Sequence, residues 1–217
     1  MIEFQNVSYS HKKGYGVNNL NMTIKNGDFT FLIGPTGSGK TTLMRLLYFD
    51  LLPDSGIVKV NGFTSNKINS RRISKARKKT GMVFQDYKLL QDRTLFENVA
   101  LPLHVMGFPI KEISARVDEA IEMVGLEGKE NHMPDELSGG EQQRASLARA
   151  FIKEPDIILA DEPTGNLDPV ASFELVRLLE TIHETGTTIL MASHNYNLIK
   201  GRGRSIFELK NGNLRVR

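Results

Sequence analysis

The sequence contains no cysteine among its 217 residues. Without cysteine the chain forms no disulfide and no thiolate metal site, so we expect it in a reducing compartment. No apolar run approaches the roughly 18 residues that a membrane-spanning helix requires. The start of the chain alternates polar and apolar residues, which is typical of a strand rather than a secretory leader. The net charge of only +3 does not by itself indicate nucleic acid binding.

Hydrophobic residues make up 40% of the chain, enough for a full core, and the length favours a single domain. Apolar runs alternate with helical patterns, which predicts a layered α/β fold. We expect strands at 2–8, 19–24, 28–33, 57–61, 80–84, 157–161, 187–192 and 205–210. We expect helices near 40–48, 111–124, 139–153 and 170–184.

The region between the early and late strands is mostly helical in pattern. We therefore expect one domain over 1–217, with a core formed by 1–85 and 156–217 and a helical lobe inserted at 86–155. Turn signals at 25–28 and 60–63 predict β-hairpins and hence an antiparallel portion.

A glycine-rich loop between a predicted strand and a predicted helix carries the clearest chemistry. It matches the phosphate-binding pattern G-x-x-x-x-G-K-[ST], and its glycines let several backbone N–H groups point at one anion. Lys40 is expected to reach the β- and γ-phosphates, and the Thr41 hydroxyl to bind Mg²⁺. The loop comprises Gly34, Pro35, Thr36, Gly37, Ser38, Gly39, Lys40, Thr41 and Thr42.

Two carboxylates end the apolar run at 157–160. Ligands bind at the carboxyl ends of strands in open α/β sheets, so we expect Asp161 to hold Mg²⁺ and Glu162 to act as general base toward water. His194 follows the next predicted strand and is a candidate to contact the γ-phosphate or the attacking water.

Leu137–Gln142, Leu-Ser-Gly-Gly-Glu-Gln, opens a predicted helix. Ser138 and Glu141 form a capping box pattern. A capping box does not require Gly139 and Gly140, whose exposed N–H groups suit a second anion-binding element.

In this order and context, these motifs resemble those of the ATP-binding-cassette ATPases. The resemblance covers essentially the whole chain and implies a P-loop NTPase fold with a RecA-like core, an antiparallel β portion and a helical lobe. Gln85 resembles the Q-loop glutamine, a catalytic and Mg²⁺-binding position beside Thr41 and Asp161, and His194 resembles the switch histidine. The residues at 165–168 resemble the D-loop, which assigns Asp168 to the nucleotide site.

The family pairs two such domains head to tail. The resemblance therefore implies a homodimer in the ATP-bound state, with ATP held between the phosphate loop of one chain and Ser138, Gly139, Gly140 and Glu141 of the other. Hydrolysis would then depend on dimerisation. One position departs from the family pattern: where an aromatic residue, often tyrosine, usually stacks on adenine, this chain has His11, with Tyr9 and Tyr15 on either side.

Within the family, residues 84–94, 96–103 and 162–168 resemble a subgroup of cell-division and lipoprotein-releasing ATPases. This implies a cytoplasmic ATPase, peripheral on the inner face of the cell membrane, that drives an integral membrane protein and controls cell-wall hydrolysis. The alternatives are an export subunit and, more remotely, a nucleic-acid-associated ATPase. No direct nucleic acid contact is expected.

Two segments keep alternative interpretations. The basic cluster at 71–79 suits either a solvated helix face or an anionic phosphate surface. Tyr87, Leu89 and Leu90 either line a groove for the membrane partner, near 85–95, or are buried in the lobe.

Overall fold

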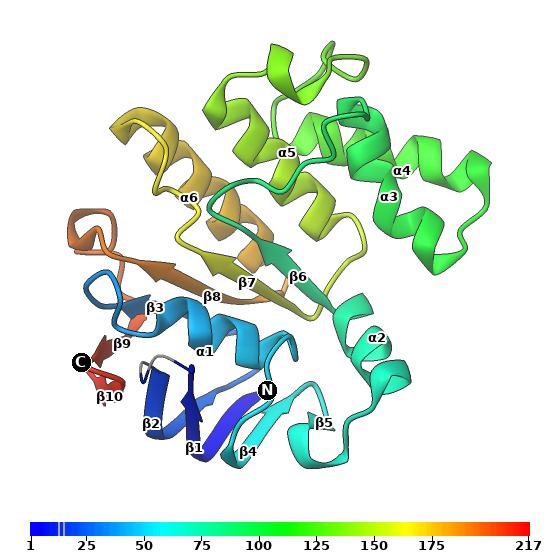
Figure 1. The fold of residues 1–217 in the computed structure, drawn as a ribbon. Coiled ribbons are helices and arrows are strands. Elements are labelled where there is room, and N and C mark those ends of the chain that lie inside the picture. The colour runs from blue at the N-terminus through cyan, green and yellow to red at the C-terminus, as the bar shows by residue number, and fades with distance from the viewer. Residues whose placement is uncertain (13, 15) are drawn as a thin grey trace.

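Two sheets organise the chain (Figure 1), and the computed structural model describes residues 1–12, 14 and 16–217 of it. Within that range the first sheet is antiparallel and has the order β2-β1-β4-β5. Its strands alternate buried and exposed side chains, because only one face packs on the core. The strands are β1 (Ile2–Ser10), β2 (Gly16–Ile24), β4 (Ser55–Val60) and β5 (Phe63–Thr64).

The second sheet has the order β10-β9-β3-β8-β7-β6, and its strands are parallel except for β10. Every residue of β3, β6, β7 and β8 is buried, as expected for parallel strands covered on both faces. The strands are β3 (Phe29–Ile33), β6 (Thr80–Val83), β7 (Ile157–Asp161), β8 (Thr188–Ser193), β9 (Ser205–Lys210) and β10 (Asn213–Val216).

Helices cover both faces of the parallel sheet (Figure 1). The apolar side of α1 (Lys40–Leu47) packs in one cluster with β1, β2 and β4, so this helix lies between the two sheets. On the other face, α6 (Pro169–Glu184) packs against β3, β7 and β8. A short helix, α2 (Ser70–Lys78), leads into β6. Short 3₁₀ helices lie at Ser65–Lys67, Pro134–Glu136 and Tyr196–Leu198.

A third apolar cluster draws its buried residues from 89–152 and joins α3 (Leu95–Met106), α4 (Ile110–Met123) and α5 (Gly139–Phe151). These helices stand together at the upper right of Figure 1. The division into a core and a lobe at 85/86 and 155/156 stays a prediction. None of the helices among the described residues combines the length and apolarity needed to cross a bilayer.

Three local predictions concern the turns at 60–63 and 25–28 and the side chain of Leu89. The hairpin at 60–63 is confirmed, because Asn61 and Gly62 have positive φ and Val60 pairs with Phe63. The hairpin at 25–28 is wrong: a turn forms there, but it joins β2 to β3 in different sheets. Of the two alternatives given for Leu89, burial in the lobe is the one the structure supports, because this side chain is only 7% exposed within the third cluster.

The loop before α3 is held by one buried amide. Asn98 is fully buried; its Oδ1 accepts from Leu90 N at 2.8 Å, and its Nδ2 donates to the carbonyl oxygens of Leu90, Arg93 and Thr94 at 3.0–3.1 Å. A single buried side chain thus forms hydrogen bonds to four backbone groups of the loop before α3.

Asn98→Ala should lower the free energy of unfolding by about 2–4 kcal/mol, because it leaves the Leu90 N–H and the Arg93 carbonyl oxygen without these partners. Urea unfolding measures the change. Asn131→Ala, at an exposed position of the same region, is the control and should stay within about 0.5 kcal/mol of wild type. Equal stabilities for the two variants would contradict the role given to Asn98.

Candidate active site

The phosphate-binding loop closes tightly between β3 and α1. Gly37 and Gly39 have φ of 78° and 106°, a region that favours glycine. At Gly34 a Cβ would lie 2.2 Å from the carbonyl oxygen of Leu209, so only glycine fits there. No side chain caps the start of α1, which leaves its first N–H groups free to meet an anion.

Lys40 lies inside the curl of this loop and is 4% exposed. Its ammonium donates to the carbonyl oxygens of Gly34 at 2.7 Å and Pro35 at 3.1 Å. It also forms an ion pair with Oε1 of Glu162 at 3.0 Å. A carboxylate thus occupies the side of the lysine toward which a phosphate would bind.

Glu162 links this lysine to a histidine. It directly follows β7 with φ of 47°, a strained conformation for a non-glycine residue, and its Oε2 lies 2.7 Å from Nδ1 of His194. Burial raises the pKa of Glu162, but hydrogen bonds from Lys40 and His194 outweigh it and hold the pKa below the usual range. The carboxylate is therefore ionised at neutral pH and able to accept a proton.

Asp161 is the last residue of β7 and is 8% exposed. Burial raises its pKa, while a hydrogen bond from the Thr41 hydroxyl acts in the opposite direction. Within the described residues, Oδ1 of Asp161 has no hydrogen-bond partner. A buried, unsatisfied carboxylate oxygen beside a hydroxyl fits a magnesium site, since Mg²⁺ takes oxygen ligands and keeps several waters.

Predicted site residues from several motifs line one cavity of about 360 Å³. The phosphate loop and the first turn of α1 form one wall, and Gln85, Glu162 and His194 form the rest. Its lining residues are Thr36, Gly37, Gly39, Lys40, Thr41, Thr42, Gln85, Glu162 and His194.

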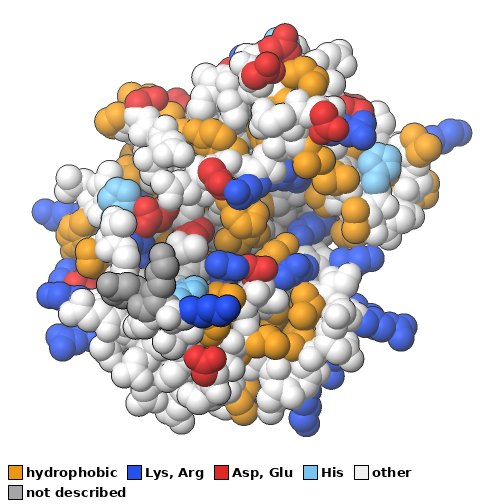
Figure 2. All heavy atoms as spheres, viewed as in Figure 1, with side chains coloured by type: hydrophobic (Ala, Val, Ile, Leu, Met, Phe, Trp, Pro, Cys, Tyr) orange, Lys and Arg blue, Asp and Glu red, His pale blue; other side chains and the backbone are white. Residues whose placement is uncertain are grey.

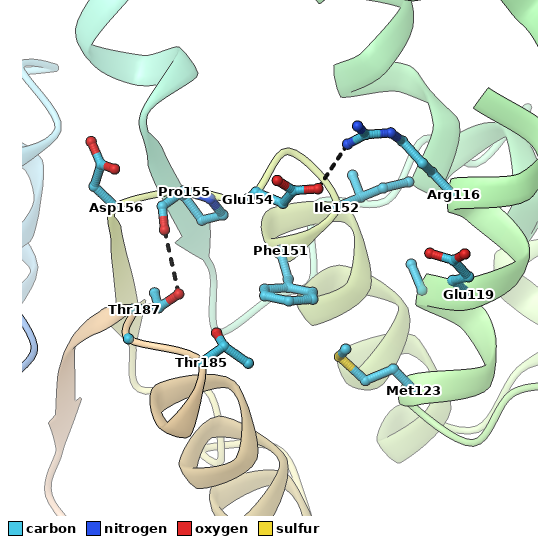
Figure 3. A pocket seen from close by; sticks show the side chains of 12 residues that line it. Arg116, Glu119, Met123, Phe151, Ile152, Glu154, Pro155, Asp156, Thr185 and Thr187 are labelled. Atoms are coloured by element: carbon cyan, nitrogen blue, oxygen red, sulfur yellow. Dashed lines mark hydrogen bonds and ion pairs between the residues drawn. The ribbon is translucent and has the colours of Figure 1, made fainter. Parts of the chain in front are cut away.

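A larger cavity of about 530 Å³ lies at the opposite edge of the sheet, where β7 and β8 begin (Figure 3). An ion pair of 2.8 Å between Arg116 and Glu154 borders it, and Phe151 and Met123 form an apolar part of its wall. None of the predicted site residues lines this cavity, so we assign it no part in the chemistry.

The Ser-Gly-Gly segment lies outside the first cavity of its own chain. Ser138 caps α5 in a capping box with Glu141, as predicted. Hydrogen bonds from Lys129 and Ser138 lower the pKa of Glu141 to about 2. Asp168 caps α6, its Oδ1 accepting from the N–H groups of Val170 and Ala171. None of the residues Ser138–Glu141 or Asp168 lines the cavity that holds Lys40.

His11 lies beside the start of α1. Its Nε2 is 3.0 Å from the Thr42 hydroxyl, and its ring meets the Tyr9 ring edge to face at 4.9 Å. This places an aromatic pair next to the phosphate loop. Adenine stacking on His11 stays a prediction, and Tyr15 lies outside the described residues.

Sequence reasoning missed the contacts that hold the Q-loop. Tyr87 and Lys88 both have positive φ, and the Arg149 guanidinium donates to their carbonyl oxygens at 2.8 and 2.7 Å. The fully buried Gln143 donates to the carbonyl oxygen of Phe84 at 3.1 Å. The helix that begins with the Ser-Gly-Gly segment therefore fixes the backbone on both sides of Gln85.

Comparison with known proteins agrees with this geometry. The sequence profile of the ABC transporter family matches residues 17–165, and the chain belongs to this family of ATP-hydrolysing cassettes.

Among its relatives is the cell division ATP-binding protein FtsE of Mycobacterium tuberculosis, 47% identical over 99% of this chain and 94% of that protein. The FtsE protein of Escherichia coli K12 is 40% identical over 99% of this chain and 97% of that protein. A dimeric ATP-binding cassette, solved in a post-hydrolysis state with ADP and phosphate, superimposes with a TM-score of 0.91 at 35% identity, over 100% of this chain and 98% of that one.

Arg149→Lys should lower the ATP hydrolysis rate by about tenfold or more while ATP binding is retained. A lysine ammonium cannot donate to both carbonyl oxygens as the planar guanidinium does, and small misplacements of reacting groups cost large factors in rate. Phosphate release and nucleotide titration measure the two quantities. Arg116→Lys, on the surface of α4, is the matched control; equal rates in both variants would contradict the positioning role.

Proposed function

We propose that the chain is the ATP-hydrolysing subunit of a complex with a membrane protein, in a cell-division role like that of the FtsE relatives. The observation that carries the ATPase chemistry is the chain of contacts from Lys40 through Glu162 to His194 within one cavity. It joins a phosphate-binding cation, an ionised base and an orienting histidine.

When ATP binds, the Lys40 ammonium is proposed to leave its ion pair with the Glu162 carboxylate and to pair with the β- and γ-phosphates instead. The released Glu162 carboxylate then accepts a proton from the attacking water, and His194 orients Glu162 or the γ-phosphate. Asp161, Thr41 and Gln85 would hold Mg²⁺, which neutralises charge on the phosphates when bound. The N–H groups at the start of α1 bind phosphate oxygens.

The complete site is proposed to need two chains. Gly139 and Gly140 begin α5, where N–H groups suit an anion, yet they lie outside the cavity of their own chain. A similar cassette was solved as a dimer with ADP and phosphate. Ser138, Gly139, Gly140 and Glu141 would thus close the site of a second copy, and Asp168 would lie at the same interface.

The membrane partner is proposed to be an integral protein of the FtsX type, bound on the cytoplasmic face, which makes the chain a peripheral membrane protein. A groove of about 570 Å³ between α2 and α3 offers a docking place for a partner helix. Val105 lies on the rim of this groove and is 68% exposed. The apolar side chains of Ile73, Leu101 and Met106 form part of the groove wall. An export role of the LolD or MacB type is the alternative, and the identity of the co-purifying membrane protein decides between them.

Glu162→Gln should keep ATP binding and lower turnover by at least about 100-fold, because the amide cannot accept the proton. It should also accumulate an ATP-bound dimer, seen by size-exclusion chromatography. Asp156→Asn, just before the other end of β7, is the control and should keep normal turnover. Normal turnover in Glu162→Gln would contradict the assignment of the base.

Ser138→Arg should abolish hydrolysis but spare ATP binding to the single chain, because a bulky cation would stand where the other chain's nucleotide docks. Mixing it with Lys40→Ala chains should restore activity, since one of the two composite sites is then intact. A mixture that stays inactive, although mass analysis shows mixed dimers, would contradict independent shared sites.

Val105→Asp should release the membrane partner while ATP binding persists, because it places a charge in the apolar groove. Co-purification from detergent extracts measures partner retention. Ile110→Asp, at an exposed apolar position outside the groove, is the control. If both variants retain the partner, the docking place is wrong.

A further inference from the structure

The positive charge of the chain is concentrated on and beside α2. Residues 67–79 contain seven lysines and arginines and no acidic residue. Since these seven exceed the net charge of +3, the remainder of the chain is net negative. This short segment therefore makes a large contribution to the chain's attraction for anions. Figure 2 shows Lys and Arg side chains gathered at the right of the molecule, where Figure 1 places α2.

Some of these cations have structural roles. Arg77 stacks on the Tyr48 ring at 4.7 Å and donates to the carbonyl oxygens of Tyr48 and Phe49. Lys79 pairs with Asp156 at 3.6 Å. These two residues fasten α2 to the core, and we do not count them as available for another ligand.

Three of the remaining five cations form a stripe along the helix. Arg71, Lys75 and Lys78 follow one another at i, i+4 and i+7, so they lie on one face of α2. Arg71 and Lys75 are exposed, and among the described residues none of the three has an ion-pair partner. We call these three residues the basic stripe.

The basic stripe lies beside the groove proposed for the membrane partner. Ser70, Ile73, Ser74 and Lys78 of α2 line that groove. A membrane protein seated there would hold α2 close to the bilayer surface, so this inference rests on the proposed function. The cytoplasmic leaflet carries anionic lipids, whose potential attracts basic segments within about a Debye length, ~8 Å.

We propose that the basic stripe binds anionic lipid headgroups. The three charges are spread over about 10 Å of one helix face, at 1.5 Å per residue. A row of charges along one face suits a flat charged surface. Residues 70–79 contain no aromatic side chain on which a base could stack, which disfavours single-stranded nucleic acid as the ligand.

The test uses the purified full chain without its partner and sediments it with lipid vesicles. Wild type should bind phosphatidylcholine vesicles containing about 30% phosphatidylglycerol, should not bind pure phosphatidylcholine, and should lose binding as salt rises. Each basic residue near an anionic surface contributes roughly fivefold, so Arg71→Gln with Lys75→Gln should weaken binding by roughly 25-fold.

Lys25→Gln with Lys111→Gln removes the same charge from exposed positions elsewhere and should weaken binding by less than about threefold. ATP hydrolysis, measured on both variants, reports intact folding. The inference is overturned if wild type shows no preference for phosphatidylglycerol, if both double variants lose binding equally, or if duplex DNA binds through Arg71 and Lys75 more tightly than the vesicles do. If the wild-type chain fails to bind phosphatidylglycerol vesicles but still co-purifies the membrane partner, this inference alone is contradicted. If the wild-type chain binds the vesicles but no membrane partner co-purifies, the proposed partner is contradicted.

Discussion

The register of three parallel strands brings the candidate site residues together at one edge of the sheet. Strand β8 pairs with β3 on one side and β7 on the other, which places Ile33 opposite Ser193 and Asp161 opposite Ala192. The residues that follow these ends therefore emerge at one edge of the sheet. Lys40, Glu162 and His194 come from segments far apart in the sequence, and only this register brings them within ion-pair distance.

Lys40 and Glu162 form an ion pair between two largely buried side chains, so separating them without a substitute would leave charges in a poorly solvated place. In the proposed mechanism the phosphates of ATP would be that substitute for Lys40, while His194 would remain beside Glu162. Nucleotide binding and release of the proposed base would then be coupled. Arg149 and Gln143 of α5 hold the backbone around Gln85, so a change at the proposed nucleotide site would be transmitted to the helix whose glycines are proposed to face the second chain.

Much of the fold could be predicted from sequence, because the strands of the parallel sheet are continuous apolar runs. The strands at 157–161 and 205–210 match the structure residue for residue. The helix at 95–106 was not recognised, since it is apolar on most sides and contains Pro102. The prediction of a hairpin at 25–28 is wrong because the residues of a turn do not determine which sheet the next strand joins.

Part of the candidate site could be predicted from the sequence and part could not. The glycines, the lysine and the strand-end carboxylates form local patterns, so the sequence alone predicts them as site residues. Arg149 and Gln143 donate to backbone carbonyl oxygens distant in sequence, and such contacts leave no local pattern. The burial of Leu89 likewise depends on how the lobe helices pack around it.

One chain is proposed to hold two half-sites, so that hydrolysis requires a second chain. The ATP hydrolysis rate per chain, measured over a wide range of protein concentration with the mass of the species followed in parallel, tests this directly. The rate per chain should rise with concentration as ATP-bound dimers form and then reach a plateau. A constant rate per chain, in a range where only monomers are present, would contradict the requirement for a second chain.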